Sequence, residues 1–468
     1  MHDQMLIGKI MNGANSVRLF MKKRLLLSNT QIIALGFMLI ILAGSVLLSL
    51  PVATRSGQAV NYLDALFTAT TATCVTGLVV HDTFTQWSLF GQIVILVLIQ
   101  IGGLGFMSIA TLFSLMLRRT ISYKERLMLS ESISVEQTSG IVRIIQHVLL
   151  GTIMFEGIGA VILAVRFIPD FGFAGGVYKG VFHAVSAFCN AGIDLMGESV
   201  PFHSLMDYQG DWIVNLTVMA LIIIGGLGFY VWEDIYHCKN WRGLHLHSKL
   251  VILMSIVLIF GGALLIFLME FRNPQTLAPL PWHTKVLTSL FQAVSPRTAG
   301  FNTLNLNSLT TASTFVIMLL MFIGGAPGST AGGIKITTLG MLIFTAISTM
   351  RGTPDVNAFH RRMEAQAIKR AVTIVLIALG VVSLGVIILS VCEPHLMFRD
   401  IVFEVISAFG TVGLSMGITP MLGTLSKLTL IVLMYFGRVG VLTIMLSLTI
   451  KSIKSKNMLR YPKGKILV

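Results

Sequence analysis

Four short segments of the chain carry the residues whose types and spacing are best suited to chemistry, and each segment ends in glycine. They contain Val75, Thr76 and Gly77; Asn190, Ala191 and Gly192; Thr298, Ala299 and Gly300; and Thr411, Val412 and Gly413. A cation that leaves water needs other oxygen atoms in place of its hydration shell, and rings of backbone carbonyls can supply them. Glycine allows the backbone angles that turn such carbonyls inward, and it adds no side chain. The four segments therefore predict a selectivity filter that binds a dehydrated cation.

The segments are related in sequence, and each follows a short amphipathic stretch that begins with phenylalanine. Phe67, Phe182 and Phe403 each stand ten residues before the glycine of their segment. In the third segment the spacing from Phe291 to Gly300 is nine residues. Stretches this short and polar do not cross a bilayer, and non-helical backbone is tolerated at membrane depth only where it is buried or lines water. We therefore expect four re-entrant pore loops; four interfacial helices on the outer surface are the alternative, which leaves the terminal glycines unexplained.

The elements that must position these segments are membrane-spanning helices. Hydrophobic residues make up 54% of the 468 residues and charged residues 12%, whereas soluble domains usually carry about 25% charged residues. A helix needs roughly 20 apolar residues to cross a bilayer. Eight stretches meet or approach that length, at about 31–51, 87–117, 144–168, 212–232, 250–270, 313–350, 371–391 and 426–450. The sequence thus predicts an all-α membrane protein with eight transmembrane helices, and it shows no cleavable signal peptide before the first of them.

The net charge of +14 agrees with this topology. Most lysines and arginines gather in five clusters, at the N-terminus and at 118–143, 239–249, 351–370 and 451–468. The positive-inside rule places all five clusters, and with them both termini, in the cytoplasm. Such clusters attract anionic membrane lipid and offer a surface to a cytoplasmic partner. Nucleic acid is not expected as a partner.

The predicted helices and pore loops repeat along the chain. The helices that precede a pore loop begin near residues 31, 144, 250 and 371. We therefore expect four parallel helix–pore loop–helix repeats around a central pore. The expected divisions are a cytoplasmic N-terminal segment, the four repeats and a cytoplasmic C-terminal tail, at 1–30, 31–125, 126–245, 246–360, 361–455 and 456–468.

The second helix of each repeat carries a cluster of small residues. The clusters are Ile101-Gly-Gly-Leu-Gly-Phe106, Ile224-Gly-Gly-Leu-Gly-Phe229, Ile323-Gly-Gly-Ala-Pro-Gly328 and Phe436-Gly-Arg-Val-Gly-Val441. They follow the filter glycines at similar distances, so we expect them roughly in the middle of their helices. Small residues let helices pack closely, and that role is the alternative to shaping the conduction path.

In the third repeat the small residues continue into a segment that cannot hold a regular helix, because it combines proline with five glycines. We expect a flexible gate loop beneath the filter, formed by Gly324, Gly325, Ala326, Pro327, Gly328, Ser329, Thr330, Ala331, Gly332, Gly333 and Lys335. The loop is similar to a phosphate-binding loop. Its lysine is one residue out of place and no Ser or Thr follows it directly, so nucleotide binding is not expected.

Five charged residues fall in or beside the predicted membrane segments. Arg297 is expected behind the filter, where it would donate hydrogen bonds to carbonyls. Arg438 is expected to form a positive barrier in the pore, because an intramembrane charge is a functional-site hypothesis by default; a buried ion pair is the alternative. Glu156 is expected to satisfy neighbouring polar groups. Asp64 and Glu404 are expected at the starts of their pore helices, with attraction of cations to the outer mouth as the alternative.

These motifs resemble the Trk/Ktr/HKT superfamily of potassium transporters, and most closely the bacterial KtrB-type membrane subunits. The resemblance rests on Ser295-Pro-Arg-Thr-Ala-Gly-Phe-Asn302 and Ser407-Ala-Phe-Gly-Thr-Val-Gly413, and it extends from the first helix to Arg460-Tyr-Pro. Thr411-Val-Gly413 also matches the first three letters of the potassium-channel signature. Eight helices are similar to KtrB, since TrkH-type relatives carry two more at the start.

The resemblance implies potassium uptake by a homodimer in the plasma membrane of a bacterium. It also implies a cytoplasmic ring of KtrA-type nucleotide-binding regulatory subunits and uptake that sodium can stimulate, with no cofactor in this chain. In sodium-selective relatives a serine replaces a filter glycine, so four glycines favour K⁺ over Na⁺. The family's gate loop and pore arginine fall on 324–335 and Arg438 of this sequence.

Two other classes of protein are weighed against the pore. A secondary transporter with an enclosed substrate pocket often shows inverted repeats, whereas the repeats predicted here all start on the same side. An intramembrane enzyme needs a catalytic group such as His-Glu-x-x-His or paired aspartates, and the sequence contains neither. Enzymatic activity is therefore not expected.

Overall fold

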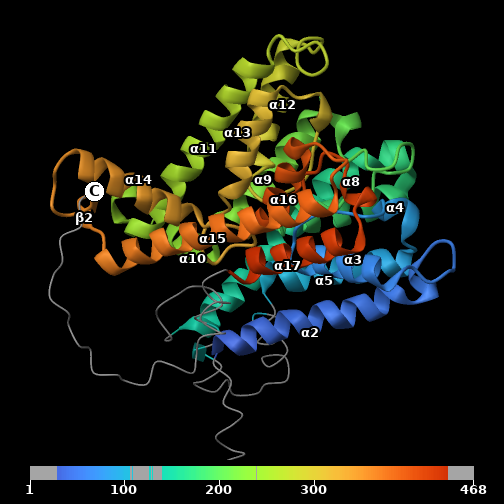
Figure 1. Ribbon diagram of the computed structural model, residues 1–468, viewed down its shortest axis with the longest axis horizontal. Coiled ribbons are helices and arrows are strands. Elements are labelled where there is room, and N and C mark those ends of the chain that lie inside the picture. The colour runs from blue at the N-terminus through green and yellow to red at the C-terminus, as the bar shows by residue number, and fades with distance from the viewer. Residues whose placement is uncertain are drawn as a thin grey trace, which may run out of the picture.

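The computed structural model of the chain describes residues 29–105, 108, 126, 127, 129, 140–238 and 240–440. The predictions for the N-terminal segment, for the C-terminal tail and for most of the basic cluster at 118–143 lie outside these residues. Within them the protein is almost entirely helical (Figure 1). A two-stranded antiparallel hairpin of β1 (Asn357–Ala358) and β2 (Arg361–Arg362) is the exception.

The helices follow one another in the predicted order. The first two repeats contain α2 (Asn29–Ser49), α3 (Tyr62–Thr73), α4 (Thr83–Gln86), α5 (Leu89–Leu104), α8 (Ile141–Phe188), α9 (Trp212–Gly226) and α10 (Phe229–His237). The last two contain α11 (Leu246–Glu270), α12 (Trp282–Val294), α13 (Thr311–Phe322), α14 (Ile336–Met350), α15 (Ala365–Cys392), α16 (Phe398–Gly410) and α17 (Thr424–Val439). Short 3₁₀ turns lie at Pro51–Ala53, Met206–Tyr208, Trp241–Gly243, Leu306–Ser308 and Thr419–Met421.

Among the described residues, four helices, α2, α8, α11 and α15, are long and apolar enough to cross a membrane, and the bent pair α9 and α10 is a fifth candidate. The helix α8 covers both a predicted span and the predicted pore segment after it, because the helix continues through a kink. Gly172 lies at the kink with φ 74°, and Pro169 precedes it. A residue with this φ ends regular helical geometry, and glycine adopts it without strain. The part of α8 beyond Gly172 therefore corresponds to the short helices α3, α12 and α16.

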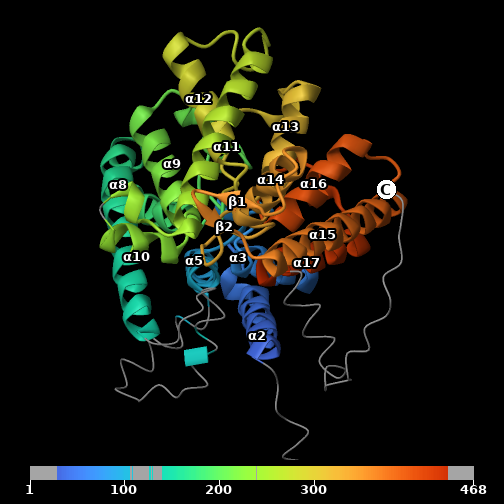
Figure 2. The ribbon, with the colours of Figure 1, turned by 90° about the vertical axis from the view of Figure 1, so that its left-hand side faces the viewer.

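The elements are arranged around the middle of the molecule in chain order. In Figure 2 the colours pass from blue (α2, α3, α5) through green (α8, α9) and yellow (α11, α12) to red (α16, α17). The contacts agree with this order, since α5 packs against α8, α9 against α12, and α13 against α16. The circle closes where α17 packs against α3. The chain thus returns to its first repeat.

The same contact recurs in each predicted repeat between the helix before the short helix and the helix after it. In each repeat a glycine of the first helix faces a leucine of the second, so that the helices approach closely. The pairs are Gly44 with Leu98, Gly159 with Leu221, Gly262 with Leu320, and Gly385 with Leu433. Each leucine stands four residues before the first glycine of its small-residue cluster. The clusters therefore lie at matching places.

The small-residue clusters end their helices, which differs from the predicted mid-helix position. The helices α5 and α17 stop before Gly105 and Gly440, at which φ is 79° and 92°. Gly228, with φ 92°, separates α9 from α10, and these two helices enclose an angle of 92°. Side-chain-bearing residues rarely adopt such angles. The predicted span at 212–232 is therefore broken, and α5 and α17 end inside the predicted spans 87–117 and 426–450. The stretch 313–350 is interrupted between α13 and α14, where the sequence predicts a break in the helix.

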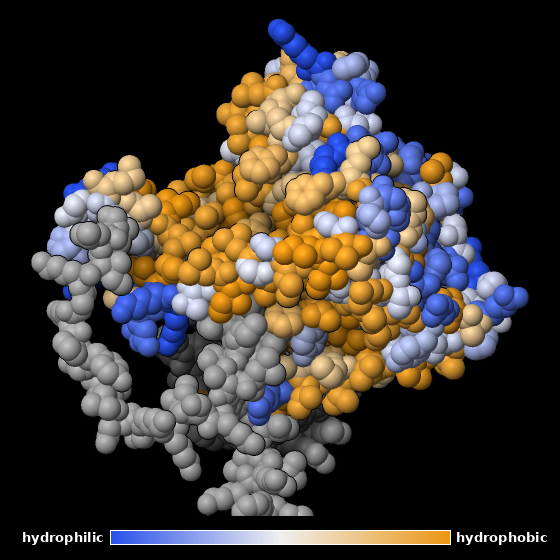
Figure 3. Space-filling model, in the orientation of Figure 1, coloured by the Kyte–Doolittle hydropathy of each residue, from blue (hydrophilic) through white to orange (hydrophobic). Residues whose placement is uncertain are grey.

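The outer surface of the helices is strongly apolar. Figure 3 shows hydrophobic side chains over the face that carries α11, α13, α15 and α17, with polar residues gathered at the edges. Large hydrophobic side chains on long helices are exposed, among them Leu150, Ile153, Val165, Leu376 and Ile387. Apolar patches of this extent mark contact with a membrane or a protein partner.

Candidate functional site

The four predicted glycine segments meet at one place, with the backbones of Gly77, Gly192, Gly300 and Gly413 in contact. A methyl group on any one of these glycines would overlap the carbonyl oxygen that precedes the glycine of the next segment. The pairs are Gly77 with Ala191 O, Gly192 with Ala299 O, Gly300 with Val412 O, and Gly413 with Thr76 O. We call this closed set of contacts the glycine ring.

The backbone of each segment adopts an uncommon conformation at the same position. Two residues before each glycine, a residue with a side chain has positive φ: Val75 (56°), Asn190 (60°), Thr298 (66°) and Thr411 (50°). The four glycines also have positive φ, from 63° to 94°. Positive φ is rare for β-branched residues such as valine and threonine. Strain of this kind persists where the surrounding structure fixes it, and it clusters at functional sites.

Hydroxyl groups at the ends of the short helices hold the segments. In the first and fourth repeats the amide nitrogens of Gly77 and Gly413 donate to Thr71 Oγ1 (3.0 Å) and Ser407 Oγ (3.1 Å). In the second and third repeats the hydroxyl donates instead, from Ser186 Oγ to Ile193 O (2.7 Å) and from Ser295 Oγ to Phe301 O. The sequence analysis missed these residues, although a Ser or Thr stands at the matching position of all four repeats.

Backbone hydrogen bonds fix the direction in which the N–H groups of the segments point. The amides of Thr76, Ala191 and Val412 donate to the carbonyls of Thr71, Ser186 and Ser407, at 2.7 to 2.9 Å. In the third repeat the amide of Ala299 donates to Ser295 O (2.9 Å). The N–H groups of the segments therefore point back to the ends of the short helices. Those ends carry partial negative charge, which favours a cation.

The clusters of small residues bring the second helices against the short helices. A methyl group on Gly102, Gly225 or Gly437 would overlap the carbonyl oxygen of Thr73, Phe188 or Phe409, respectively. Each of these carbonyls belongs to the residue four positions before a ring glycine. Close packing through small residues, which the sequence analysis weighed as one role of the clusters, is therefore present in three repeats.

Arg297 is buried, with 6% of its surface exposed. Its Nη2 donates to Ser255 Oγ of α11 (3.1 Å), and its Nε has no hydrogen-bond partner. The sequence predicted hydrogen bonds from Arg297 to carbonyls of the filter, but the guanidinium donates to the Ser255 hydroxyl instead. The side chain of Arg297 therefore connects the third segment to α11.

Residues 323–335, between α13 and α14, form a loop that contacts two other predicted repeats, the second and the fourth. The amides of Ala326 and Thr330 donate to Gly226 O (3.0 Å) and Gly225 O (3.3 Å), at the break after α9. The amide of Gly333 donates to Gly437 O of α17 (3.1 Å). Lys335 turns back onto its own loop, where Nζ donates to Ala331 O (2.7 Å). The loop thus joins the ends of helices from different repeats.

Arg438 binds both this loop and α5. Its Nη1 donates to Thr330 O, and its Nη2 donates to Gly102 O (2.5 Å) and Gly103 O (3.1 Å). The hydroxyl of Thr330 donates in turn to Phe188 O (3.2 Å) at the end of α8. The partners of Arg438 are carbonyls, which disagrees with the alternative of a buried ion pair.

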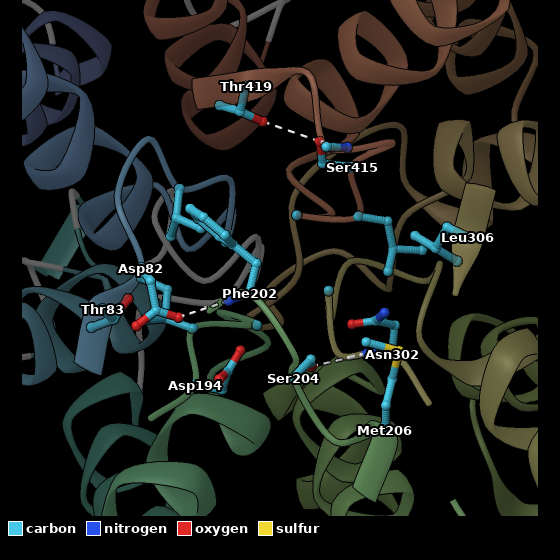
Figure 4. A pocket seen from close by; sticks show the side chains of 18 of the residues that line it. Asp82, Thr83, Asp194, Phe202, Ser204, Met206, Asn302, Leu306, Ser415 and Thr419 are labelled. Atoms are coloured by element: carbon cyan, nitrogen blue, oxygen red, sulfur yellow. Dashed lines mark hydrogen bonds between the residues drawn. The ribbon is translucent and has the colours of Figure 1, made fainter. Parts of the chain in front are cut away.

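A cavity of about 310 Å³ opens beside the glycine ring, on the side of the residues that follow the glycines (Figure 4). Its lining includes all four ring glycines and two carboxylates, Asp82 and Asp194. Asp82 accepts hydrogen bonds from the amides of Thr85 and Phe202, both at 2.9 Å. Asp194 accepts from the amide of Met196 (3.0 Å). Burial raises the pKa of Asp194 to about 6, and a cation in the cavity would favour its ionised form.

Of the two carboxylates predicted at the starts of pore helices, Asp64 lies at such a start and Glu404 does not. Asp64 lies in the first turn of α3, where it pairs with Lys427 (2.8 Å) and His81 (3.1 Å). Glu404 lies in the middle of α16 and accepts hydrogen bonds from Ser415 (2.8 Å) and Thr419. The acidic residue in the first turn of α16 is Asp400. The predicted correspondence between Asp64 and Glu404 is therefore wrong.

The comparisons with known proteins agree with this geometry. Residues 19–460 match the model of the TrkH family, described as cation transport proteins. The chain is 42% identical to the potassium/sodium uptake protein NtpJ of Enterococcus hirae, over 96% of this chain and 99% of that protein. It is also 42% identical to the Ktr system potassium uptake protein B of Bacillus subtilis, over 93% of this chain and 96% of that protein.

A solved structure shares the fold. The crystal structure of the potassium transporter TrkH from Vibrio parahaemolyticus superposes with a TM-score of 0.72 at 17% identity, over 92% of this chain and 87% of that one. The glycine ring and the apolar helices therefore belong to a membrane protein of the cation-transport class. The chain is a member of the TrkH family.

We predict that Ser407→Ala weakens both the fold and the discrimination between cations. The substitution leaves the partly buried amide of Gly413 without its partner, which costs about 1 kcal/mol. Ser407→Thr keeps a hydroxyl and serves as the control. The measurements are the thermal unfolding midpoint of the purified protein and the relative uptake of different alkali cations. Equal values for Ser407→Ala and the wild type would contradict the assigned role.

Proposed function

We propose that this protein takes up potassium through a channel-like pore whose selectivity filter consists of backbone carbonyls. The glycine ring carries the proposal, because four chain segments bring their backbones together with no side chain between them. The proposed filter consists of residues 75–77, 190–192, 298–300 and 411–413, with the carbonyl oxygens facing a shared axis. Four parallel repeats, at the boundaries 31–125, 126–245, 246–360 and 361–455, would each contribute one segment.

Two observations support K⁺ as the transported ion: the names of the relatives and the glycine in each of the four segments. The relatives described above are named for the uptake of potassium, or of potassium and sodium. Carbonyl rings replace the hydration shell of K⁺, and all four segments keep the glycine that sodium-selective relatives replace by serine. K⁺ is therefore the proposed transported ion, and Na⁺ is a second ion that can take part in uptake or stimulate it.

The loop at 323–335 is the proposed gate. It lies across the ends of helices from two other predicted repeats, held by hydrogen bonds to Gly225, Gly226 and Gly437. Arg438 adds a positive charge that a cation would have to pass, and it fastens the loop to α5 through Thr330. An intramembrane charge opposes a permeating cation. Opening would require the loop to release these carbonyls.

The assembly that we propose has a homodimer in the plasma membrane of a bacterium, with both termini in the cytoplasm. A cytoplasmic ring of KtrA-type subunits, which bind nucleotide through their own domains, would control the gate. The name of the Bacillus subtilis relative, a Ktr system protein B, supports a multicomponent system. The exposed arginines Arg361 and Arg362 of the hairpin β1–β2 belong to the surface available to such a partner.

The proposed function predicts that Gly413→Ser lowers the preference for K⁺ over Na⁺. A side chain on Gly413 would overlap Thr76 O, and φ of 92° is strained for serine. The measurement is uptake of K⁺ and Na⁺, together with growth rescue at low potassium, in cells that lack other potassium uptake systems. Gly57→Ser is the control, because Gly57 has φ of 69° and open space around it. Wild-type competition between the ions in Gly413→Ser would contradict the filter.

The gate predicts that Arg438→Ala raises uptake in the absence of a regulatory partner, by about a hundredfold or more. The substitution removes charged hydrogen bonds to Thr330 and Gly102, each of which contributes about 1.5–3 kcal/mol to the closed arrangement. Initial rates of rubidium uptake into proteoliposomes measure the effect. Arg351→Ala, which removes an exposed charge beyond α14, is the control. Slower uptake by a well-folded Arg438→Ala protein would argue against a barrier.

A further inference from the structure

Three polar side chains from different elements meet behind the second glycine segment. They are Gln100 of α5, Glu156 of α8 and Cys189, which directly precedes Asn190 of the segment. Gln100 Nε2 donates to both carboxyl oxygens of Glu156, each at 3.1 Å. The thiol of Cys189 lies 3.7 Å from Glu156 Oε1 and 3.7 Å from Gln100 Oε1. The carboxyl group of Glu156 therefore contacts both α5, through Gln100, and the base of the second segment, through Cys189.

Glu156 lies where an ionisable side chain costs free energy, because its surroundings are apolar. It stands in the middle of a helix that is apolar enough to span a membrane, and only 9% of its surface is exposed. Ionisable residues within membrane helices are rare and have functional roles by default. Cys189 is fully buried, and its side chain lies against Gly103 of α5. A carboxyl that touches the residue beside the filter is placed to control the position of that residue.

The same site is connected to the proposed gate. From Gln100 the helix α5 continues to Gly102 and Gly103, whose carbonyls accept the hydrogen bonds of Arg438. Arg438 binds Thr330 O of the loop, and the Thr330 hydroxyl donates to the carbonyl of Phe188, the residue before Cys189. The contacts therefore form a closed circuit, which runs from the base of the second segment through the loop and α5 and back through Glu156.

Within the part of the chain that the structure describes, the other predicted repeats show no equivalent circuit. The residue three positions before each ring glycine is Cys74, Cys189, Arg297 or Gly410. Arg297 reaches Ser255 instead of a carboxyl. The second segment is thus tied to the neighbouring helix α5 by a carboxyl group, whereas the third is supported by a guanidinium on its own repeat.

We propose that Glu156 is a positioning residue of the filter, which fixes the second glycine segment against α5 and thereby links that segment to the gate loop. The inference rests on the proposed function. Glu156 acts through Cys189 and Gln100 and does not touch the ion. Its loss would let the base of the second segment move, which changes the spacing of the carbonyls and hence the discrimination between K⁺ and Na⁺.

The test compares ion discrimination among variants of the full-length protein in proteoliposomes. Glu156→Leu removes both acceptor oxygens, and we expect the K⁺ preference over Na⁺ to fall roughly five- to tenfold, since buried hydrogen bonds of this kind are lost. Glu156→Gln keeps the size and one acceptor oxygen, so it should restore most of the preference. Cys189→Ala should shift it in the same direction as Glu156→Leu. The double variant should lose less than the sum of the single losses, because both substitutions remove one shared contact.

The control is Ile153→Ala on the same helix, whose side chain is 68% exposed; its discrimination should equal that of the wild type. Wild-type discrimination in Glu156→Leu or, if that variant does not fold, in Cys189→Ala would overturn the inference. An equal loss in Ile153→Ala would also overturn it, since a general weakening of α8 would then explain the effect. If Gly413→Ser lowers the preference for K⁺ over Na⁺ and Glu156→Leu does not, the role of Glu156 is wrong and the proposed filter stands. If neither variant changes the preference, the proposed filter is wrong as well.

Discussion

The close approach of four backbones is the constraint on which the rest of the structure depends. At Gly77, Gly192, Gly300 and Gly413 any side chain would strike the carbonyl of the next segment. Such a ring has no side chains to hold it together, so its shape must come from its surroundings. The hydroxyl groups of Thr71, Ser186, Ser295 and Ser407 and the backbone bonds to the short helices provide that support. The strained residues before each glycine follow from the same requirement.

The repeats are alike where the ring is built and differ beneath it. Three repeats place a glycine of the second helix, Gly102, Gly225 or Gly437, against the end of a short helix. In the third repeat the matching glycine, Gly324, instead begins the loop at 323–335 and packs against that loop's own Gly332. In the fourth repeat Arg438 takes the place of a second small residue and binds the loop. These departures fall in the residues that we propose as the gate.

The sequence predicted the parts of this structure that depend on local spacing. The segments of the glycine ring meet in the structure, and each follows a short helix or the end of α8, as the spacing in the sequence indicated. The division into helices was less well predicted. Gly105, Gly228 and Gly440 end helices inside stretches that hydropathy alone marks as continuous, because hydropathy carries no information on φ.

The remaining features depend on contacts between distant parts of the chain. The partner of Arg297 is Ser255, and the partners of Arg438 come from α5 and the loop, which no spacing could indicate. Asp82 and Asp194 line the cavity only because two loops of different repeats meet there. The supporting hydroxyl groups form an intermediate case. Their recurrence is visible in the sequence, but a Ser or Thr near a helix end has many other roles.

The central claim is that carbonyl oxygens of the four segments surround a dehydrated cation on one axis. An experimental structure of the protein in rubidium, with the ion located by its anomalous scattering, tests this claim most directly. The account predicts a rubidium peak on the axis, within coordination distance of carbonyl oxygens from all four segments. The protein used should be active in uptake and saturated with rubidium. A rubidium peak elsewhere, with none among the glycine segments, would contradict the proposed filter.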